Sequence, residues 1–140
     1  MSYSNFYKRY KKENTKAIII INEQHKLLDE QKKILEEKYE VYEVLQVPAQ
    51  GWTLQEMDEI IDRLTSKEVR GNKRLLDIVF VSPIPYLLVQ LTRKEVDWVP
   101  EYAEQTGITV RVFHNDRREK KELPNGKIIQ AVAETGWQLI

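Results

Sequence analysis

Residues 17–21 read Ala-Ile-Ile-Ile-Ile, which is the longest apolar run in this 140-residue chain. The run is short, almost entirely β-branched, and closed by the polar residue Asn22. Such a run is typical of a strand that is buried on both faces, as strands are in a parallel sheet. It therefore predicts a central strand with helices packed on both of its sides.

Strand-like and helix-like segments alternate along the rest of the chain. Strands are predicted at residues 17–21, 41–47, 75–81 and 108–113, and helical segments at 27–39, 54–64, 83–91 and 96–105. Parallel strands need a crossover connection, which is usually a helix. The alternation predicts an α/β fold: a Rossmann-like three-layer domain with a mostly parallel sheet of four strands, helices on both faces and a C-terminal β-hairpin.

Two of the helix starts carry their own local signals. Thr53, with Glu56 three residues later, has the spacing of a capping box, in which each residue bonds the backbone of the other. Pro83 and Pro85 both suit the first turn of a helix, where a missing N–H costs nothing.

The C-terminal region has the clearest turn signal. Pro124-Asn125-Gly126 separates residues 120–123 from 127–132. An Asn-Gly pair between extended segments predicts a β-hairpin. Residues 137–140 form either a last short strand or a tail docked on the core.

The composition excludes several classes of protein. The chain has 22 Lys and Arg, 22 Asp and Glu, and no cysteine. Disulfide scaffolds, iron–sulfur clusters, thiolate zinc sites and cysteine nucleophiles are therefore excluded. A formal charge of zero argues against a general duplex-DNA binder. No apolar run approaches the roughly 20 residues of a membrane span, and no targeting signal opens the sequence, so we expect a cytoplasmic protein with no membrane partner.

The first sixteen residues are interpreted as a basic, aromatic arm, separate from a single Rossmann-like domain at 17–140. Residues 8–16 carry a local net charge of +4, and Tyr3, Phe6, Tyr7 and Tyr10 have helix-like spacing. Two interpretations remain open. The arm is either a solvated extension partly packed by its aromatic rings, or a contact to nucleic acid or a partner subunit.

A ligand site is expected at the carboxyl ends of the parallel strands, where loops and helix N-termini converge. The residues that follow the four predicted strands are Asn22, Glu23, Gln24 and His25; Gln50, Trp52 and Thr53; Ser82; and His114, Asn115, Asp116, Arg117 and Arg118. Residues 111–121 add a local charge of +3. Hydrogen-bonding and basic groups with a stackable ring suit a phosphate-bearing, base-containing ligand. The alternative is an ordinary polar loop surface and a solvated hairpin face.

Most motifs of familiar enzymes are missing. The chain contains no Gly-x-Gly-x-x-Gly, no P-loop and no Gly-x-Ser-x-Gly elbow, so we expect neither a dinucleotide cofactor nor a hydrolase triad. With His25 and His114 as the two histidines, a multi-histidine metal site is impossible. One histidine beside Asp116 or Glu23 is the metal-binding alternative that the sequence leaves open, and we expect no metal. Trp52 either stacks on a base or covers the sheet edge.

The strand that ends at Asn22, the helix opened by Ser82-Pro83 and the polar end of the fourth strand resemble the CARF-like proteins, the CRISPR-associated Rossmann-fold domains. The resemblance covers roughly residues 17–115 and includes small stand-alone ring nucleases. It implies a homodimer that binds cyclic oligoadenylate across its two-fold axis. Some members of the family cleave the ring and others sequester it.

The resemblance also implies a chemistry for the residues at the strand ends. Metal-independent cleavage would use the 2′-hydroxyl of the ligand as nucleophile, so the protein supplies alignment and charge. The expected catalytic residues are His114, as general acid, and Arg117; the expected ligand-binding residues are Asn22, His25, Trp52, Ser82, Pro83, Asn115 and Arg118.

Two other functions remain open. The first is a non-enzymatic interaction module that binds protein or nucleic acid through the basic arm and the hairpin around Asn125-Gly126. The second is a nucleotide-handling enzyme of another kind, with a Rossmann-like core and no cofactor. The fold alone does not choose among these functions.

Overall fold

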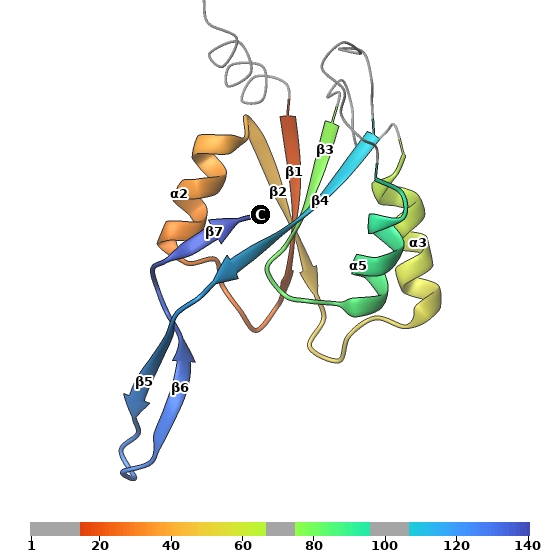
Figure 1. The fold of residues 1–140 in the computed structure, drawn as a ribbon. Helices are drawn as coiled ribbons and strands as arrows, with labels where there is room; N and C mark the ends of the chain where they lie inside the picture. Colours follow the sequence, from red (N-terminus) through yellow and green to blue (C-terminus); the bar gives the residue numbers. More distant parts are fainter. Residues whose placement is uncertain (1–14, 67–74, 96–106) are drawn as a thin grey trace, which may run out of the picture.

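The structure is a computed structural model that describes residues 15–66, 75–95 and 107–140 (Figure 1). The elements within these ranges are β1 (Thr15–Asn22), α2 (Asp29–Lys38), β2 (Val41–Val47), α3 (Leu54–Leu64), β3 (Leu75–Phe80), α5 (Pro85–Thr92), β4 (Gly107–Asn115), β5 (Arg118–Glu122), β6 (Ile128–Val132) and β7 (Trp137–Leu139). The helix expected at 96–105 lies outside the described residues, as does the arm up to residue 14.

The main sheet has five strands in the order β2-β1-β3-β4-β7. The first four are parallel to one another, which confirms the prediction of a mostly parallel α/β sheet. Ile19 of β1 lies between Val44 of β2 and Val79 of β3, so the run that predicted a central strand is central. β7 pairs antiparallel with β4, and residues 137–139 are therefore a strand and not a docked tail.

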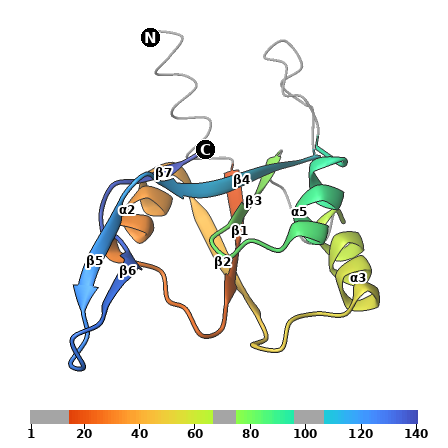
Figure 2. The ribbon, with the colours of Figure 1, turned by 60° about the horizontal axis from the view of Figure 1, so that its bottom comes forward.

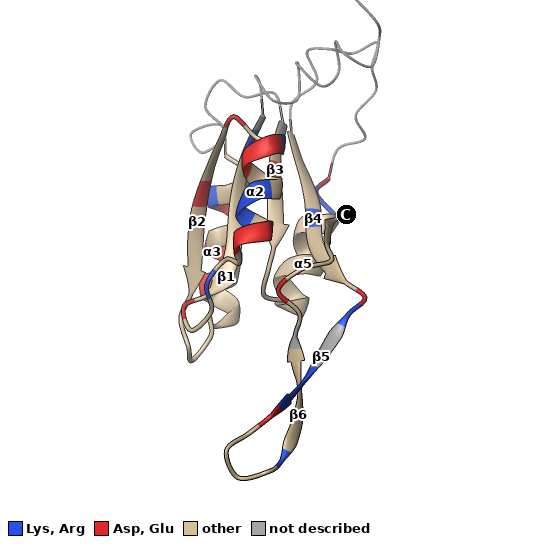
Figure 3. Ribbon diagram, turned by 90° about the vertical axis from the view of Figure 1, so that its left-hand side faces the viewer, with Lys and Arg blue, Asp and Glu red and all other residues tan. Residues whose placement is uncertain are grey.

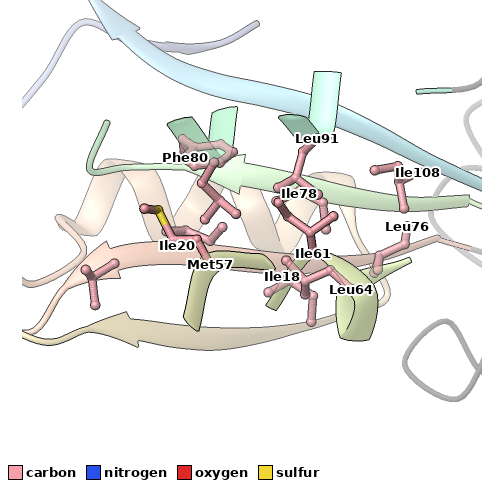
Figure 4. Close-up of a cluster of buried hydrophobic side chains, with 12 residues drawn as sticks. Ile18, Ile20, Met57, Ile61, Leu64, Leu76, Ile78, Phe80, Leu91 and Ile108 are labelled. Atoms are coloured by element: carbon pink, nitrogen blue, oxygen red, sulfur yellow. The ribbon is translucent and has the colours of Figure 1, made fainter. Parts of the chain in front are cut away.

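The two faces of the sheet bury different sets of side chains. Alternate residues of β1 point to opposite faces because side chains alternate along a strand. Ile18 and Ile20 pack with α3 and α5, whereas Ala17 and Ile19 pack with α2. Figures 1 and 2 show α2 on one side of the sheet and α3 with α5 on the other. Figure 4 shows the larger cluster, in which each fully buried aliphatic side chain contributes about 1.5–3 kcal/mol.

The helix starts follow their local signals in one case and depart from them in another. The Thr53 hydroxyl accepts a bond from the Glu56 N–H at 3.1 Å, and the Glu56 carboxylate accepts one from the Thr53 N–H at 3.1 Å. This capping box is as predicted. α5 begins at Pro85, so the expectation that Pro83 also lies in the first turn is wrong: Ile84 between them is extended, and the chain turns into the helix after it. No helix among the described residues is long and apolar enough to cross a membrane.

The predicted hairpin forms a separate two-stranded sheet. β5 and β6 pair antiparallel from Arg118 opposite Val132 to Glu122 opposite Ile128. Gly126 has φ +83°, a conformation that favours glycine, and the Asn125 side chain accepts a bond from the Lys127 N–H at 3.0 Å. The hairpin projects from the main sheet, as Figures 1 and 3 show.

Candidate functional site

The strand order reverses direction between β1 and β3. From β1 the chain crosses through α2 to β2 on one side, whereas β3 lies on the other side of β1. The loop after β1 leads to α2 on one face, and the loop after β3 leads to α5 on the opposite face. Ligands of open α/β sheets bind where two such loops part at the carboxyl ends of the strands. This edge is therefore the candidate site.

Asn22 and Ser82 are in direct contact at this edge. The Ser82 hydroxyl oxygen accepts a bond from the Asn22 N–H at 2.8 Å. The Asn22 side-chain oxygen accepts a bond from the Gln24 N–H at 2.9 Å, and the His25 N–H donates to the Asn22 carbonyl at 2.9 Å. The N–H groups of residues 81 and 82 both donate to the Ile20 carbonyl, at 2.9 and 3.2 Å. The two loops are thus joined at their first residues.

His114 lies on β4 and has a different partner. Its Nε2 is 2.5 Å from the Asp116 carboxylate, and about half of its side chain is exposed. β4 leaves β3 after Val112 opposite Phe80, and His114 pairs with Gln138 of β7. The hydrogen bonds of the described residues join Asn22 to Ser82 and His114 to Asp116, but none joins these two pairs. The predicted residues therefore form two groups along the carboxyl edge.

Asn115 has a structural role next to His114. It is 7% exposed; its Nδ2 donates to the Thr135 carbonyl at 2.8 Å, and its side-chain oxygen accepts from the Arg117 N–H at 2.7 Å. A Cβ placed on Gly136 would lie 3.2 Å from the Arg117 Cδ, so the stem of Arg117 runs alongside that glycine. The Asn115 amide joins the chain before and after the hairpin, and a ligand would have to compete with both bonds.

The other predicted site residues are dispersed. His25 and Pro83 are exposed in the loops after β1 and β3. Trp52 is half-buried, packs against the α3–α5 cluster and lines a cavity of about 420 Å³ between β2 and α3. This position tests neither base stacking nor covering of the sheet edge by Trp52, and both stay predictions. The backbone of Arg118 starts β5, and its side chain lies outside the described residues.

The two helix N-termini nearest this edge differ in their electrostatics. The first turn of α2 contains Asp29 and Glu30, which repel an anion. The first turn of α5 contains no acidic residue, and its N-cap residue, Ile84, makes no side-chain bond to the helix. Because the backbone N–H groups of a first turn attract negative charge, a phosphate is favoured at α5, next to Ser82.

A buried polar cluster around Asp77 escaped the sequence analysis. Asp77 is 5% exposed and accepts bonds from the Tyr39 hydroxyl at 2.5 Å, from the Thr109 hydroxyl, and from the Arg111 Nε at 3.0 Å. Burial, and then the Asp77 carboxylate, raise the pKa of Tyr39 far above its usual value of 10. A single acidic residue within the apolar strand Leu75–Phe80 was the available signal. With three donors already bound, Asp77 anchors α2, β3 and β4 to one another.

The described residues contain no group of three or more acidic or histidine side chains that could hold a metal ion. The residues predicted for the carboxyl edge offer hydroxyl, amide, imidazole and guanidinium groups. Hydroxyl, amide and guanidinium groups donate hydrogen bonds, and the guanidinium is positively charged, which suits oxyanions such as phosphates.

Comparison with known proteins adds no relative to this picture. No family model matches the chain, and neither does any curated protein or solved structure. The CARF-like resemblance stays a prediction, which depends on Asn22, on Ser82-Pro83 and on the polar residues at the end of β4.

Proposed function

We propose that this chain is a Rossmann-like domain that binds a cyclic oligonucleotide of the oligoadenylate class at the carboxyl edge of β1 and β3. The observation that carries the proposal is the contact between Asn22 and Ser82 where the strand order reverses. In the interpretation set out above, the bound ring is sequestered or cleaved.

The hydrogen bonds at this edge leave two donors for a ligand. The Ser82 oxygen accepts from the Asn22 backbone, so its own hydrogen is available to a phosphate oxygen. The Asn22 side-chain oxygen is bound by Gln24, which leaves the amide Nδ2 as a donor. α5 begins three residues after Ser82, and the N–H groups of its first turn after Pro85 would add to these donors in holding a phosphate.

Cleavage, if it occurs, would use the His114–Asp116 pair. Attack of a ribose 2′-hydroxyl on the adjacent phosphorus forms a 2′,3′-cyclic phosphate and gives the hydroxyl proton to water. The bond from phosphorus to the 5′-oxygen breaks, and that oxygen needs a proton as it leaves. Asp116 orients the His114 imidazole, which would donate that proton, and Arg117 would offset the charge that develops on the phosphoryl oxygens.

The test is thermal unfolding of the purified chain with cyclic oligoadenylates of different ring sizes. At about 100 times Kd, binding stabilises the folded state by about 2.7 kcal/mol, which raises Tm by on the order of 10 °C. Asn22→Ala and Ser82→Ala should each abolish this rise, measured from the Tm of the variant itself. A wild-type chain whose Tm responds to none of these rings at micromolar concentration would refute the proposal.

Two substitutions serve as matched controls. Asn125 accepts a bond from the N–H two residues on, as Asn22 does, but in the hairpin turn. The Ser66 hydroxyl bonds the Arg63 carbonyl at the end of α3, away from the carboxyl edge. Asn125→Ala and Ser66→Ala should keep the full rise in Tm.

A second candidate function, an interaction module, is favoured by the hairpin. Ile128 and Ile129 are 67% and 42% exposed on a two-stranded sheet, which is marginally stable alone. Lys120, Lys121 and Lys127 are exposed on the same hairpin. If this function is correct, deleting residues 1–14 or replacing both isoleucines with threonine should abolish partner binding. The response to cyclic oligoadenylate should survive both changes if the first proposal holds.

A further inference from the structure

The outer edge of β2 is a long and poorly protected sheet edge. β2 is the last strand on its side of the sheet, and its seven residues pair on the inner side with β1 (Figure 3). It contains no proline and no lysine, and Val41 and Val44 are 43% and 48% exposed. Native proteins usually protect such an edge with short strands, charges or proline. β7, the other edge, is three residues long.

The single charge on β2 does not protect the edge. The Glu43 carboxylate is 3.2 Å from the Lys16 Nζ on the neighbouring strand β1. This ion pair partly offsets the Glu43 charge, although the Glu43 side chain stays 61% exposed. Within residues 15–66, 75–95 and 107–140, β2 pairs with β1 and with no strand on its outer side, where its backbone N–H and C=O groups could bond another strand.

A groove runs beside this edge, between β2 and α3. Two cavities of about 420 and 270 Å³ share Leu45 and Arg63 in their linings. The first is also lined by Trp52 and Ile60, and the second by Val44. Among the described residues, the edge therefore combines backbone groups that no strand pairs with apolar side chains beside two cavities.

The charges along α3 indicate what fills the groove. Glu56 and Glu59 line the larger cavity towards the start of α3, and Arg63 lines it near the end. Arg63 would repel a uniformly basic segment in this groove, and Glu56 and Glu59 would repel a uniformly acidic one. A copy of the same helix running in the opposite direction matches both ends, because acid then faces base twice.

We propose that two copies of this chain pair their β2 strands antiparallel about a two-fold axis, so that their sheets become continuous. Glu59 of each copy then faces the partner's Arg63, and Ile60 and Leu45 are covered near the axis. Antiparallel pairing places the two carboxyl edges at opposite ends of the joined sheet. Each chain would then hold its own ligand, and no ring would be shared across the two-fold axis. The dimer itself does not depend on the proposed function.

The test is a charge swap followed by sedimentation velocity without ligand. Arg63→Glu places a glutamate opposite the partner's Glu59, and Glu59→Arg places an arginine opposite the partner's Arg63. Each variant should raise the dimer Kd by about tenfold or more, since like charges meet twice, and an equimolar mixture of the two should restore a dimer. Val44→Lys, which puts a charge in the middle of the edge, should weaken the dimer in the same way. Circular dichroism checks that each variant is folded.

Charge reversals on the hairpin, Glu122→Arg and Lys127→Glu, are the controls and should leave the dimer Kd unchanged. Three results would overturn the inference. The first is a wild-type chain that stays monomeric at submillimolar concentration, and the second is a dimer whose Kd changes neither with Arg63→Glu or Glu59→Arg nor with Val44→Lys. The third is a dimer that is lost when residues 1–14 are deleted but not when the α3 charges are swapped. Because no ligand is present, a failure here leaves the proposed ligand site untouched.

Discussion

Replacing Tyr39 with phenylalanine tests the buried cluster around Asp77. The Tyr39 hydroxyl is 2.5 Å from the Asp77 carboxylate, and Tyr39 is 2% exposed. The substitution removes one hydrogen bond to a charged acceptor, which contributes about 1.5–3 kcal/mol. Asp77 keeps Thr109 and Arg111 as donors and is not left without partners. We therefore expect Tyr39→Phe to lower the free energy of unfolding at pH 7 by about 1.5–3 kcal/mol.

The same contact predicts a pH dependence with a definite sign. Burial and Asp77 raise the pKa of Tyr39 above its usual value of 10. Above pH 10 the unfolded chain releases the tyrosine proton while the folded chain retains it, so stability falls as the pH rises. The fall is about 1.4 kcal/mol per pH unit, so the advantage of tyrosine over phenylalanine should vanish at about pH 11–12.

Urea denaturation of both chains at pH 7, 9 and 11 measures this difference, with Tyr42→Phe as the control for losing one hydroxyl in a half-buried position. Absorbance of tyrosinate gives a second measurement: the alkaline titrations of wild type and Tyr39→Phe should differ only once the chain unfolds. Two results would refute the reasoning. One is a stability difference below about 0.5 kcal/mol at pH 7; the other is a difference that does not shrink by pH 11.

Three further predictions follow from single contacts. Thr53→Ala should lower the free energy of unfolding by about 1 kcal/mol, because the helix loses its N-cap acceptor, whereas Thr53→Ser should have little effect in the same urea titration. Measured by thermal unfolding, Gly136→Ala should lower the free energy of unfolding by roughly 2 kcal/mol and Gly51→Ala by roughly 1 kcal/mol. Both glycines have positive φ, but a Cβ at residue 136 would lie 3.2 Å from the Arg117 side chain, whereas a Cβ at residue 51 would meet open space. If the chain opens the ring, His114→Ala should reduce turnover by about 10²-fold or more in a chromatographic assay and leave binding unchanged; equal turnover would remove His114 from the chemistry.

Local signals predicted much of the fold. The β-branched run at 17–21 predicted a central parallel strand because such residues stay buried when both faces are covered. The Asn125-Gly126 turn and the Thr53 cap depend on backbone geometry within four residues, so the sequence contains all the information they need. Pro83 was misplaced because the ring that suits a first helical turn suits an extended loop equally well.

The contacts between distant segments could not be predicted in the same way. The Asp77 cluster joins residues more than thirty positions apart, from the end of α2, from β3 and from β4. Its formation depends on the strand register, which a one-residue shift would destroy. The absence of pairing between the ends of β3 and β4 has a similar cause, because β4 leaves β3 after Val112 and then pairs with β7. The sequence placed Ser82 and His114 at strand ends but could not show this divergence.

The two polar groups of the sheet differ in how far their hydrogen-bonding capacity is used, and this difference favours the carboxyl edge as the ligand site. Asp77 is buried and bound by three donors, so its bonds stabilise the fold and leave it closed to a ligand. Asn22 and Ser82 are half-buried and bind each other through one backbone N–H, which leaves the amide and the hydroxyl hydrogens free to donate. A polar group whose donors are not all used, at an accessible edge, is stabilised further by an acceptor from outside the chain. An oxyanion supplies such an acceptor, and α5 provides a first turn without acidic residues beside it.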